Sequence, residues 1–457
     1  MPDVVVVGSG PGGLAAAVTC ARAGLEVLVL EAAPEPGGGT RTREVDGLLF
    51  DECSSVHPLA LASPFLRGLD VPLRVPEASY AHPLEDAPAA VAWRDLRRTA
   101  GELGSPAWEE AFAPLVARHD EVVALALSDH RRPAAAAPLL LAGLARLLGV
   151  PHGTPAGALL AGLAAHVTSP GRLTRTAAAV LLGTLAHAGG WPVPVGGSVA
   201  IARALLRELE SLGGRVETGR LVRSVRDLPP HRALLLDTTP AAAARILGGG
   251  PAVWRRARPS PIAAATVEIV LEGHLPWADP RVAAAPTVHL GGSARQVHRA
   301  DRIAASGKEP PRPFVLLVDP AVADPSRAVG GLRPLTAYAH VPLGSLTDPA
   351  RAVLAQIERF APGARERVRA VRSRPAARLV RHDANLVGGD IAGGRLGLVG
   401  LVSRPTVLRD PYRGAPGAYL CSASVPPGPG VHGMTGWHAA RRALREVFGI
   451  RVGALPA

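Results

Sequence analysis

Lysine is almost missing from this sequence. Lys308 is the only one, so arginine supplies nearly all of the 50 basic residues. Aromatic residues are also few, with six Phe and four Tyr in 457 residues. Proteins that bind nucleic acids combine clustered basic residues with aromatic side chains that stack on bases. The arginines here are scattered, so the formal net charge of +12 indicates a solvated basic surface, and we expect no nucleic-acid partner.

Cysteine is scarce as well. Cys20, Cys53 and Cys421 lie far apart, and no C-x-x-C pair occurs. This spacing supports neither a disulfide framework nor a zinc site, and we expect no bound metal. The N-terminus leads directly into an apolar segment without a secretory signal, so the cytoplasm is the expected compartment.

No apolar run is long enough to predict a membrane-spanning helix. The most apolar stretch covers residues 138–167, and Arg146, Pro151 and Pro155 interrupt it. It is interpreted equally well as buried helices, as an apolar wall beside a substrate, or as a patch that rests on a membrane surface. The sequence also lacks G-x-S-x-G, and Gly307-Lys308 lacks the remainder of a P-loop, so a serine hydrolase and a P-loop enzyme are disfavoured.

A dinucleotide-binding motif is present at the N-terminus. Four valines, 4–7, predict a buried parallel strand, and Gly8, Gly10 and Gly13 then form G-x-G-x-x-G before an alanine-rich helix. The three glycines allow a tight turn, a close approach of pyrophosphate and close helix packing. Glu31 ends the next apolar strand, about 20 residues further on, where a carboxylate binds ribose hydroxyls. The motif alone does not separate FAD from NAD.

A second glycine cluster follows at 37–39, before Thr40 and Arg41. It lets the backbone fold back over the nucleotide, with Thr40 and Arg41 as donors to phosphate or flavin. A third glycine-rich segment, 426–436, lies between the predicted strand 418–421 and the predicted helix 437–447. Its backbone N–H groups would face an anion.

The rest of the chain alternates between two patterns. We predict helices at 108–126 and 199–212, the second capped by Ser198, and strands at 215–217, 221–225 and 233–237. Further strands at 264–271, 314–318 and 335–341 and a helix from Asp348 to Phe360 indicate a separate sheet. The expected fold class is α/β, with a Rossmann-like domain from 1–70, 189–260 and 395–457 and an interleaved α+β substrate domain from 71–188 and 261–394.

These stretches together resemble the FAD-dependent oxidoreductases of the bacterial phytoene-desaturase type, within the flavin amine oxidase superfamily. The resemblance implies FAD as the cofactor, a fold of the glutathione reductase and amine oxidase type, and a set of contacting residues. They are Gly8, Ser9, Gly10, Pro11, Gly12, Gly13, Glu31, Ala32, Gly38, Gly39, Thr40, Arg41, Val222, Val431, His432, Gly433 and Met434. The arginine often found directly after the Gly-Gly pair is displaced here to Arg41.

The function expected from this resemblance is hydride transfer from a C–H bond of a largely apolar small molecule to flavin N5. Oxygen, a quinone or another carrier would accept the electrons, because no second complete G-x-G-x-x-G indicates an NAD(P)H domain. Flavin-dependent amine oxidation, double-bond isomerisation and a flavin-binding subunit without turnover remain open. His57 and His432 are the weak candidates for a proton-transferring residue, although a structural role is favoured for His57.

Overall fold

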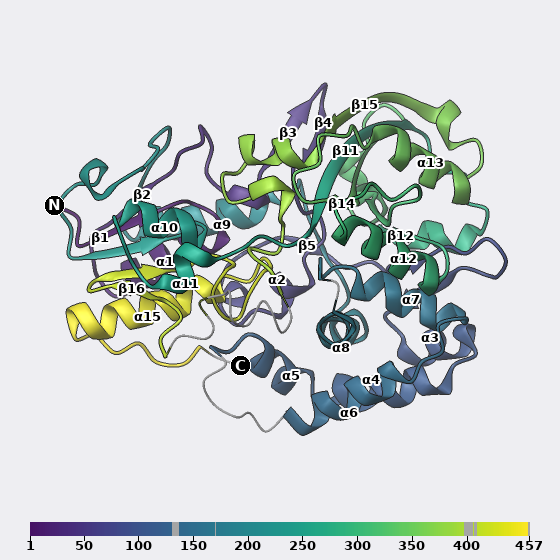
Figure 1. The fold of residues 1–457 in the computed structure, drawn as a ribbon, viewed down its shortest axis with the longest axis horizontal. Coiled ribbons are helices and arrows are strands. Elements are labelled where there is room, and N and C mark those ends of the chain that lie inside the picture. The colour runs from purple at the N-terminus through teal and green to yellow at the C-terminus, as the bar shows by residue number, and fades with distance from the viewer. Residues whose placement is uncertain (130–136, 170, 397–404, 406–408, 456–457) are drawn as a thin grey trace.

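The computed structural model describes residues 1–129, 137–169, 171–396, 405 and 409–455. The expected Rossmann-like segment 395–457 therefore includes residues 397–404, 406–408 and 456–457, which lie outside the described part. Two sheets organise the molecule, one at the left and one at the upper right of Figure 1, with a layer of helices below the second.

The first sheet is parallel except at one edge. Its central strand consists of four valines that are all buried, as a strand covered on both faces requires. In spatial order the strands are β16 (Arg413–Ala415), β17 (Ala418–Leu420), β10 (Ala233–Leu236), β1 (Val4–Val7), β2 (Val27–Leu30) and β9 (Arg215–Glu217). Only β16 runs antiparallel to its neighbour. The helices of this part are α1 (Pro11–Arg22), α2 (Pro58–Ala62), α9 (Val199–Ser211), α10 (Pro240–Ile246), α11 (Ala252–Arg256) and α15 (Met434–Phe448).

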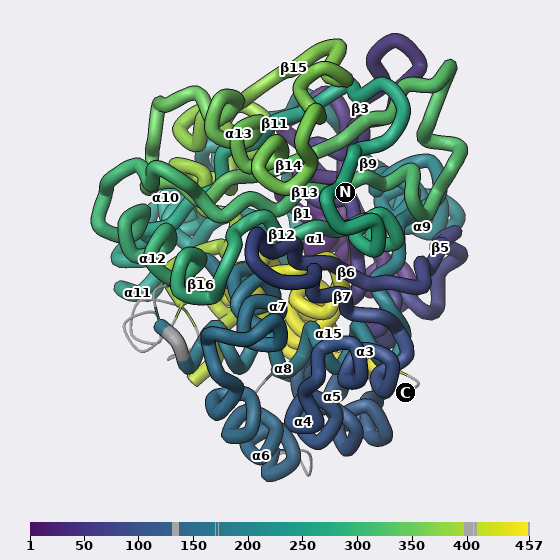
Figure 2. The backbone as a smooth tube through the Cα atoms, turned by 90° about the vertical axis from the view of Figure 1, so that its right-hand side faces the viewer, coloured from purple at the N-terminus to yellow at the C-terminus, as the bar shows by residue number. Residues whose placement is uncertain are grey.

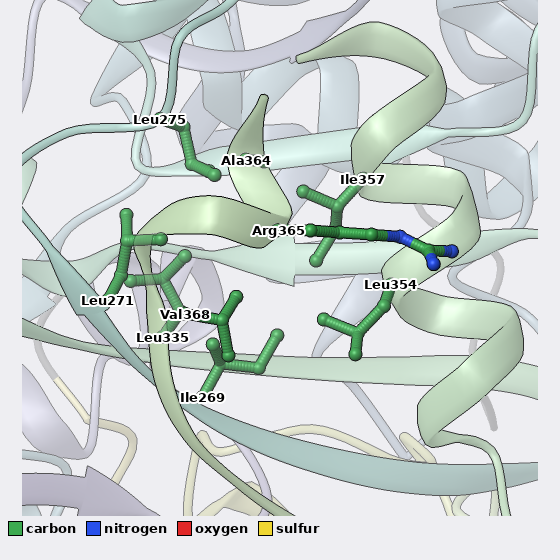
Figure 3. Close-up of a pocket in the computed structure, with 9 residues that line it drawn as sticks. All are labelled: Ile269, Leu271, Leu275, Leu335, Leu354, Ile357, Ala364, Arg365 and Val368. Carbon is green, nitrogen blue, oxygen red and sulfur yellow. The ribbon is translucent and has the colours of Figure 1, made fainter. Parts of the chain in front are cut away.

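The second sheet is mainly antiparallel. In spatial order its strands are β15 (Val368–Arg374), β11 (Ile262–Glu272), β14 (Leu332–Pro342), β13 (Val315–Val318), β12 (Thr287–Leu290), β6 (Ala78–His82) and β7 (Ala90–Trp93). Helices α12 (Ala294–Ala305) and α13 (Ala350–Phe360) belong to the same part. Figure 3 shows Ile269, Leu271 and Leu335 of the sheet facing Ile357 and Leu354 of α13, and the gap between them has no room for a water molecule. This region is therefore packed core and not a ligand site.

The helical layer contains six helices among the described residues. They are α3 (Leu96–Leu103), α4 (Pro106–Ala117), α5 (His119–Ala126), α6 (Ala137–Leu148), α7 (Pro155–Ala164) and α8 (Arg172–Ala188). Figure 2 shows α4, α5 and α6 at the end of the molecule opposite β15 and α13. Two small two-stranded sheets are also present among the described residues: the hairpin of β3 (Thr42–Val45) and β4 (Leu48–Asp51), and the pair of distant strands β5 (Leu73–Arg74) and β8 (Val193–Pro194).

Three local predictions are wrong. Residues 221–225 form no strand, because Leu221 and Val225 are about half exposed and a capping box of Ser224 and Asp227 starts a 3-10 turn there. The helix expected over 108–126 is split at Arg118, whose backbone is not helical. Ser198 does not cap α9 with its side chain, because its hydroxyl donates to the carbonyl of Ser54.

The apolar stretch 138–167 is divided between two environments. Every residue of α7 from Ala156 to Ala164 is buried, whereas α6 buries only Gly143 and Leu147 and leaves the Leu141 side chain 64% exposed. Within the described ranges, no helix combines the length and the apolar character that crossing a membrane requires.

Candidate functional site

The two glycine-rich ends of the chain meet directly. A Cβ atom built on Gly436, in the first turn of α15, would lie 1.9 Å from the carbonyl oxygen of Gly12 in α1. A Cβ built on Gly12 would lie 2.5 Å from the carbonyl oxygen of Cys421, just after β17. No real side chain tolerates such distances, so glycine is required at both positions. The first turns of α1 and α15 therefore lie next to each other, and the two helices pack together (Figure 1).

The first glycine motif forms a backbone cradle at the carboxyl ends of β1 and β10. Gly8 has a φ of +95°, and a Cβ on Gly13 would lie 2.2 Å from the carbonyl oxygen of Gly8. The amide N–H of Gly12 has no hydrogen-bond partner among the described residues. Because α1 begins here, its dipole adds positive potential at the same point. The cradle can therefore bind an anionic phosphate.

Glu31 lies at the end of β2 with both carboxylate oxygens engaged. One oxygen accepts hydrogen bonds from the Ser9 amide at 2.8 Å and the Ser9 hydroxyl at 2.5 Å. The other accepts from the amide of Ala33 at 2.8 Å. The chain after β9 runs alongside, since the amide of Arg220 donates to the Glu31 carbonyl at 2.7 Å, and Val222 is buried beyond it. The carboxylate is thus held rigidly beside the cradle.

The second glycine cluster folds back onto the first. Gly38 has a φ of +52°, and a Cβ there would lie 2.9 Å from the Cα of Gly10. The amide of Gly38 has no partner among the residues that the structure describes. The donors expected at Thr40 and Arg41 are already used by the fold: the Thr40 hydroxyl donates to Gly37, and the Arg41 guanidinium donates to the carbonyls of Gly38 and His382. The backbone amide of Gly38 is thus a donor of this loop that remains available to a ligand.

His432 supports the third glycine segment from within. Its Nδ1 accepts a hydrogen bond from the amide of Met434 at 3.0 Å, so the proton is on Nε2, which donates to the carbonyl of Gly428 at 3.1 Å. Burial lowers the pKa of His432 to about 4. This ring is neutral at pH 7 and fixes the loop from Gly428 to Met434.

His57 is also buried and neutral. The Ser198 hydroxyl donates to Ser54, so it accepts at 2.7 Å from Nε2 of His57. Burial lowers the pKa of His57 to about 4. The structure does not bring the two histidine rings together as an acid–base pair. Each one instead ties a loop to its neighbours.

Asp237 is a functional candidate that sequence reasoning missed. It follows β10, and its Oδ2 accepts from the amide of Gly13 at 2.9 Å. Burial raises the pKa of Asp237 to about 7, and the charges of Asp383 and Glu31 act in the same direction. Asn385 braces this turn by donating to the carbonyl of Asp237 at 3.0 Å. The sequence shows that Asp237 ends a predicted strand, but only the folded structure places that strand next to β1, at the ligand-binding edge of the parallel sheet.

A cluster of charged side chains joins the cradle to the second sheet. Burial raises the pKa of the Glu52 carboxyl, but the ion pairs with His382 at 2.8 Å and Arg374 at 2.9 Å outweigh it and lower the pKa to about 2. Glu268 of β11 pairs with Arg374 at 3.2 Å and also with Arg43 of β3. The two loops that carry Arg41 and His382 are therefore fixed against β11 and β15.

The second sheet presents an apolar face toward the segment after Cys53. Val56 and Tyr338 are partly buried against a cluster of Ala161, Ala165, Phe314 and Leu316. The Ser55 hydroxyl lies 3.2 Å from the Thr336 hydroxyl of β14. Deeper in, Nε2 of His166 lies 2.9 Å from Nε2 of His289, and burial lowers the pKa of His166 to about 3. Both rings are neutral at pH 7, and the ring of Phe314 packs against that of His289 with centroids 5.8 Å apart.

Comparisons with known proteins agree with this arrangement. The family described as the NAD(P)-binding Rossmann-like domain matches residues 6–64. A hydroxyneurosporene desaturase from Cereibacter sphaeroides is 62% identical over 42 residues, which are 9% of this chain and 8% of that protein. A prolycopene isomerase from an Oncidium hybrid cultivar is 40% identical over 88 residues, 18% of this chain and 15% of that protein. The chain thus matches only a short stretch of these curated relatives.

Solved structures match nearly the whole chain. A putrescine oxidase bound to putrescine has a TM-score of 0.60 at 17% identity, with 98% of this chain and 99% of that chain covered. A cyclohexylamine oxidase from Brevibacterium oxydans IH-35A has a TM-score of 0.57 at 14% identity, with 98% of each chain covered. The predicted α/β Rossmann-like fold of the amine oxidase type is confirmed, as is the resemblance to phytoene-desaturase-type proteins.

Proposed function

We propose that this protein is an FAD-dependent oxidoreductase that removes hydride from a C–H bond of a largely apolar small molecule. The observation that carries this proposal is the contact between Gly12 and Gly436, which places the N-terminal turns of α1 and α15 next to each other. FAD carries negative charge at its pyrophosphate and, once reduced, at its flavin ring. A site with two such helix ends suits both charges.

The residues present fit that cofactor. The amides of Gly12 and Gly38 would bind the pyrophosphate, Glu31 the adenosine ribose, and the backbone at Val222 the adenine. The segment from Val431 to Met434 would lie along the flavin. A Cβ on Gly8, Gly10 or Gly13 would collide with Asp237 or with the Gly8 carbonyl, so this tight turn requires glycine. When bound, the flavin supplies the hydride acceptor, and the protein supplies orientation and a dry environment.

Among the residues that the structure describes, the side chains on this side of the site are mainly apolar, and its histidines are neutral. Val56, Phe314 and Tyr338 offer an apolar surface, and the buried neutral rings of His57 and His432 fix loops. Loss of hydride to the flavin would be paired with loss of a proton from the neighbouring carbon, which forms the double bond and passes the proton to solvent water. We therefore assign positioning roles to both histidines and propose no catalytic base. The electron acceptor is oxygen, a quinone or another carrier.

Anaerobic reduction tests this proposal. The purified protein is expected to carry a yellow chromophore, which an apolar unsaturated hydrocarbon substrate bleaches and a small primary amine does not. Bleaching by the amine alone would identify an amine oxidase. Turnover of a cis-polyene without net bleaching would identify an isomerase. Protein that holds flavin but responds to no substrate or reductant would indicate a non-catalytic subunit, and protein that takes up no FAD would overturn the proposal.

A further inference from the structure

A second cavity lies away from the glycine cradle, where α7 and α12 pack together (Figure 1). Its volume is about 500 Å³, and α6 and α8 complete its wall. The lining has two chemically different parts. Leu147, Leu160 and Ala161 form an apolar part, and Arg295, Arg299 and Arg302 of α12 form a basic part beside Asp301, the one carboxylate among the described lining residues, which pairs with Arg175. This division is typical of a site for an amphiphilic ligand.

The three arginines of α12 are not neutralised by the fold. They follow one another at helical spacing, so their side chains share one face of the helix. All three are exposed, and no carboxylate of a described residue lies within ion-pair distance of them. Three unpaired like charges on one face repel each other, and a bound anion would relieve that repulsion.

Arg175 adds a buried donor to the same cavity. The side chain is 5% exposed and pairs with Asp301 at 2.6 Å, while its Nε donates to the carbonyl of Ala164 at 3.2 Å. Its Nη2 is buried and has no hydrogen-bond partner in the part of the chain that the structure describes. An unsatisfied buried N–H group is costly, and an acceptor from a ligand would satisfy it. The guanidinium is held in place by its two other contacts.

We propose that this cavity binds the carboxylate or phosphate head of an amphiphilic small molecule, whose hydrocarbon chain lies along α7. The arginines of α12 and Arg175 hold the anionic head, and Leu147 and Leu160 contact the chain. The concave shape and the buried Arg175 favour a single molecule over the surface of a bilayer. This site does not depend on the redox activity, because its residues lie outside the dinucleotide cradle.

The test measures binding to the intact protein by titration calorimetry. The probes are dodecanoate and dodecyl phosphate, with dodecanol as the neutral match and acetate as the match without a chain. We expect one molecule per chain and a dissociation constant about tenfold lower for the two anionic amphiphiles than for either match. Anionic phosphatidylglycerol vesicles serve as the membrane arm.

Variant R295Q/R299Q is expected to weaken dodecanoate binding about tenfold. Its control is R203Q/R207Q, which removes two exposed arginines at the same spacing from α9 and is expected to leave the affinity unchanged. Equal weakening in both variants would show general charge attraction and overturn the proposal. So would undetectable binding of both anionic probes, equal affinity for dodecanol, or binding to vesicles without binding to the monomeric probes.

Discussion

The glycine cradle is held together by contacts between backbone atoms, whereas the helical side of the second sheet is held together by packed side chains. In the cradle, backbone meets backbone at Gly12 and Gly436, and the ligand-facing groups are amides. On the other side, large side chains fill the space, as where the rings of Tyr80 and Trp191 stack with centroids 4.7 Å apart. Adding one methyl group should therefore disrupt the first region, whereas removing a side chain should disrupt the second.

This difference also separates the roles of the two regions. Amides at a helix N-terminus bind phosphate whatever the neighbouring side chains are, so one cradle serves many enzymes. Under the proposed function, we expect side chains such as Val56 and Tyr338 to set which small molecule is accepted. Substrate choice would then depend on the second region.

The largest effect is expected from Trp191→Ala. Trp191 is 1% exposed and packs between the helical layer and β6. Removal of its ring leaves a cavity, and we expect the free energy of unfolding to fall by about 3–5 kcal/mol. Urea denaturation measures this loss. Leu141→Ala on α6, where the side chain is 64% exposed, is the control and should change stability little. A Trp191→Ala variant as stable as that control would contradict the packing described.

A smaller loss of stability, with loss of cofactor, is expected from Gly436→Ala. Its new methyl group would meet the backbone carbonyl of Gly12, which cannot move aside. We expect a loss of about 1–3 kcal/mol together with release of FAD. Denaturation and flavin absorbance after gel filtration measure the two effects.

The matched control for this change is Gly101→Ala. Gly101 lies in α3, and a Cβ there would meet nothing within 4 Å. Alanine should stabilise that helix by about 0.5–1 kcal/mol and leave FAD bound. If Gly436→Ala retained FAD as the control does, the two helix ends would not meet as described.

The smallest effect on cofactor binding is expected from Asp237→Asn, and it depends on pH. Because the folded pKa of Asp237 is raised from 3.8 to about 7, the folded state retains a proton that the unfolded state has lost between these values. Stability therefore falls as pH rises from about 4 to about 7. The ionised carboxylate would also repel pyrophosphate, so FAD affinity should fall above pH 7.

Asparagine at position 237 should remove both pH dependences and raise FAD affinity about tenfold at pH 8. Fluorescence titration with FAD at pH 6 and pH 8 measures the change. The control is Asp70→Asn, which changes an exposed acid far from Asp237 in the sequence. Its FAD affinity at both pH values should equal that of the unaltered protein. An unchanged pH profile in Asp237→Asn would show that this carboxyl does not titrate beside the cradle.

The sequence predicted the cradle well because its physical requirements are local. Gly8, Gly10 and Gly13 lie close together in the sequence, and the strands and helices around them have clear apolar patterns. The resemblance to FAD-dependent oxidoreductases also implied that residues 8–13 and 431–434 contact one cofactor, although these segments lie more than 400 residues apart.

The remaining features depend on contacts between distant residues that no local pattern encodes. Asp237 became notable only because β10 lies next to β1, and the charges around Glu52 come from four separate segments. Leu221 and Val225 looked like strand residues, but no neighbouring strand covers them. The role of Ser198 as a partner of His57 likewise required the folded structure.

A crystal structure of the protein with FAD tests the central claim most directly. We expect pyrophosphate oxygens within hydrogen-bond distance of the amides of Gly12 and Gly38, and the flavin ring beside Gly433 at the start of α15. A dinucleotide bound elsewhere, or a flavin ring that does not reach the α15 N-terminus, would contradict it.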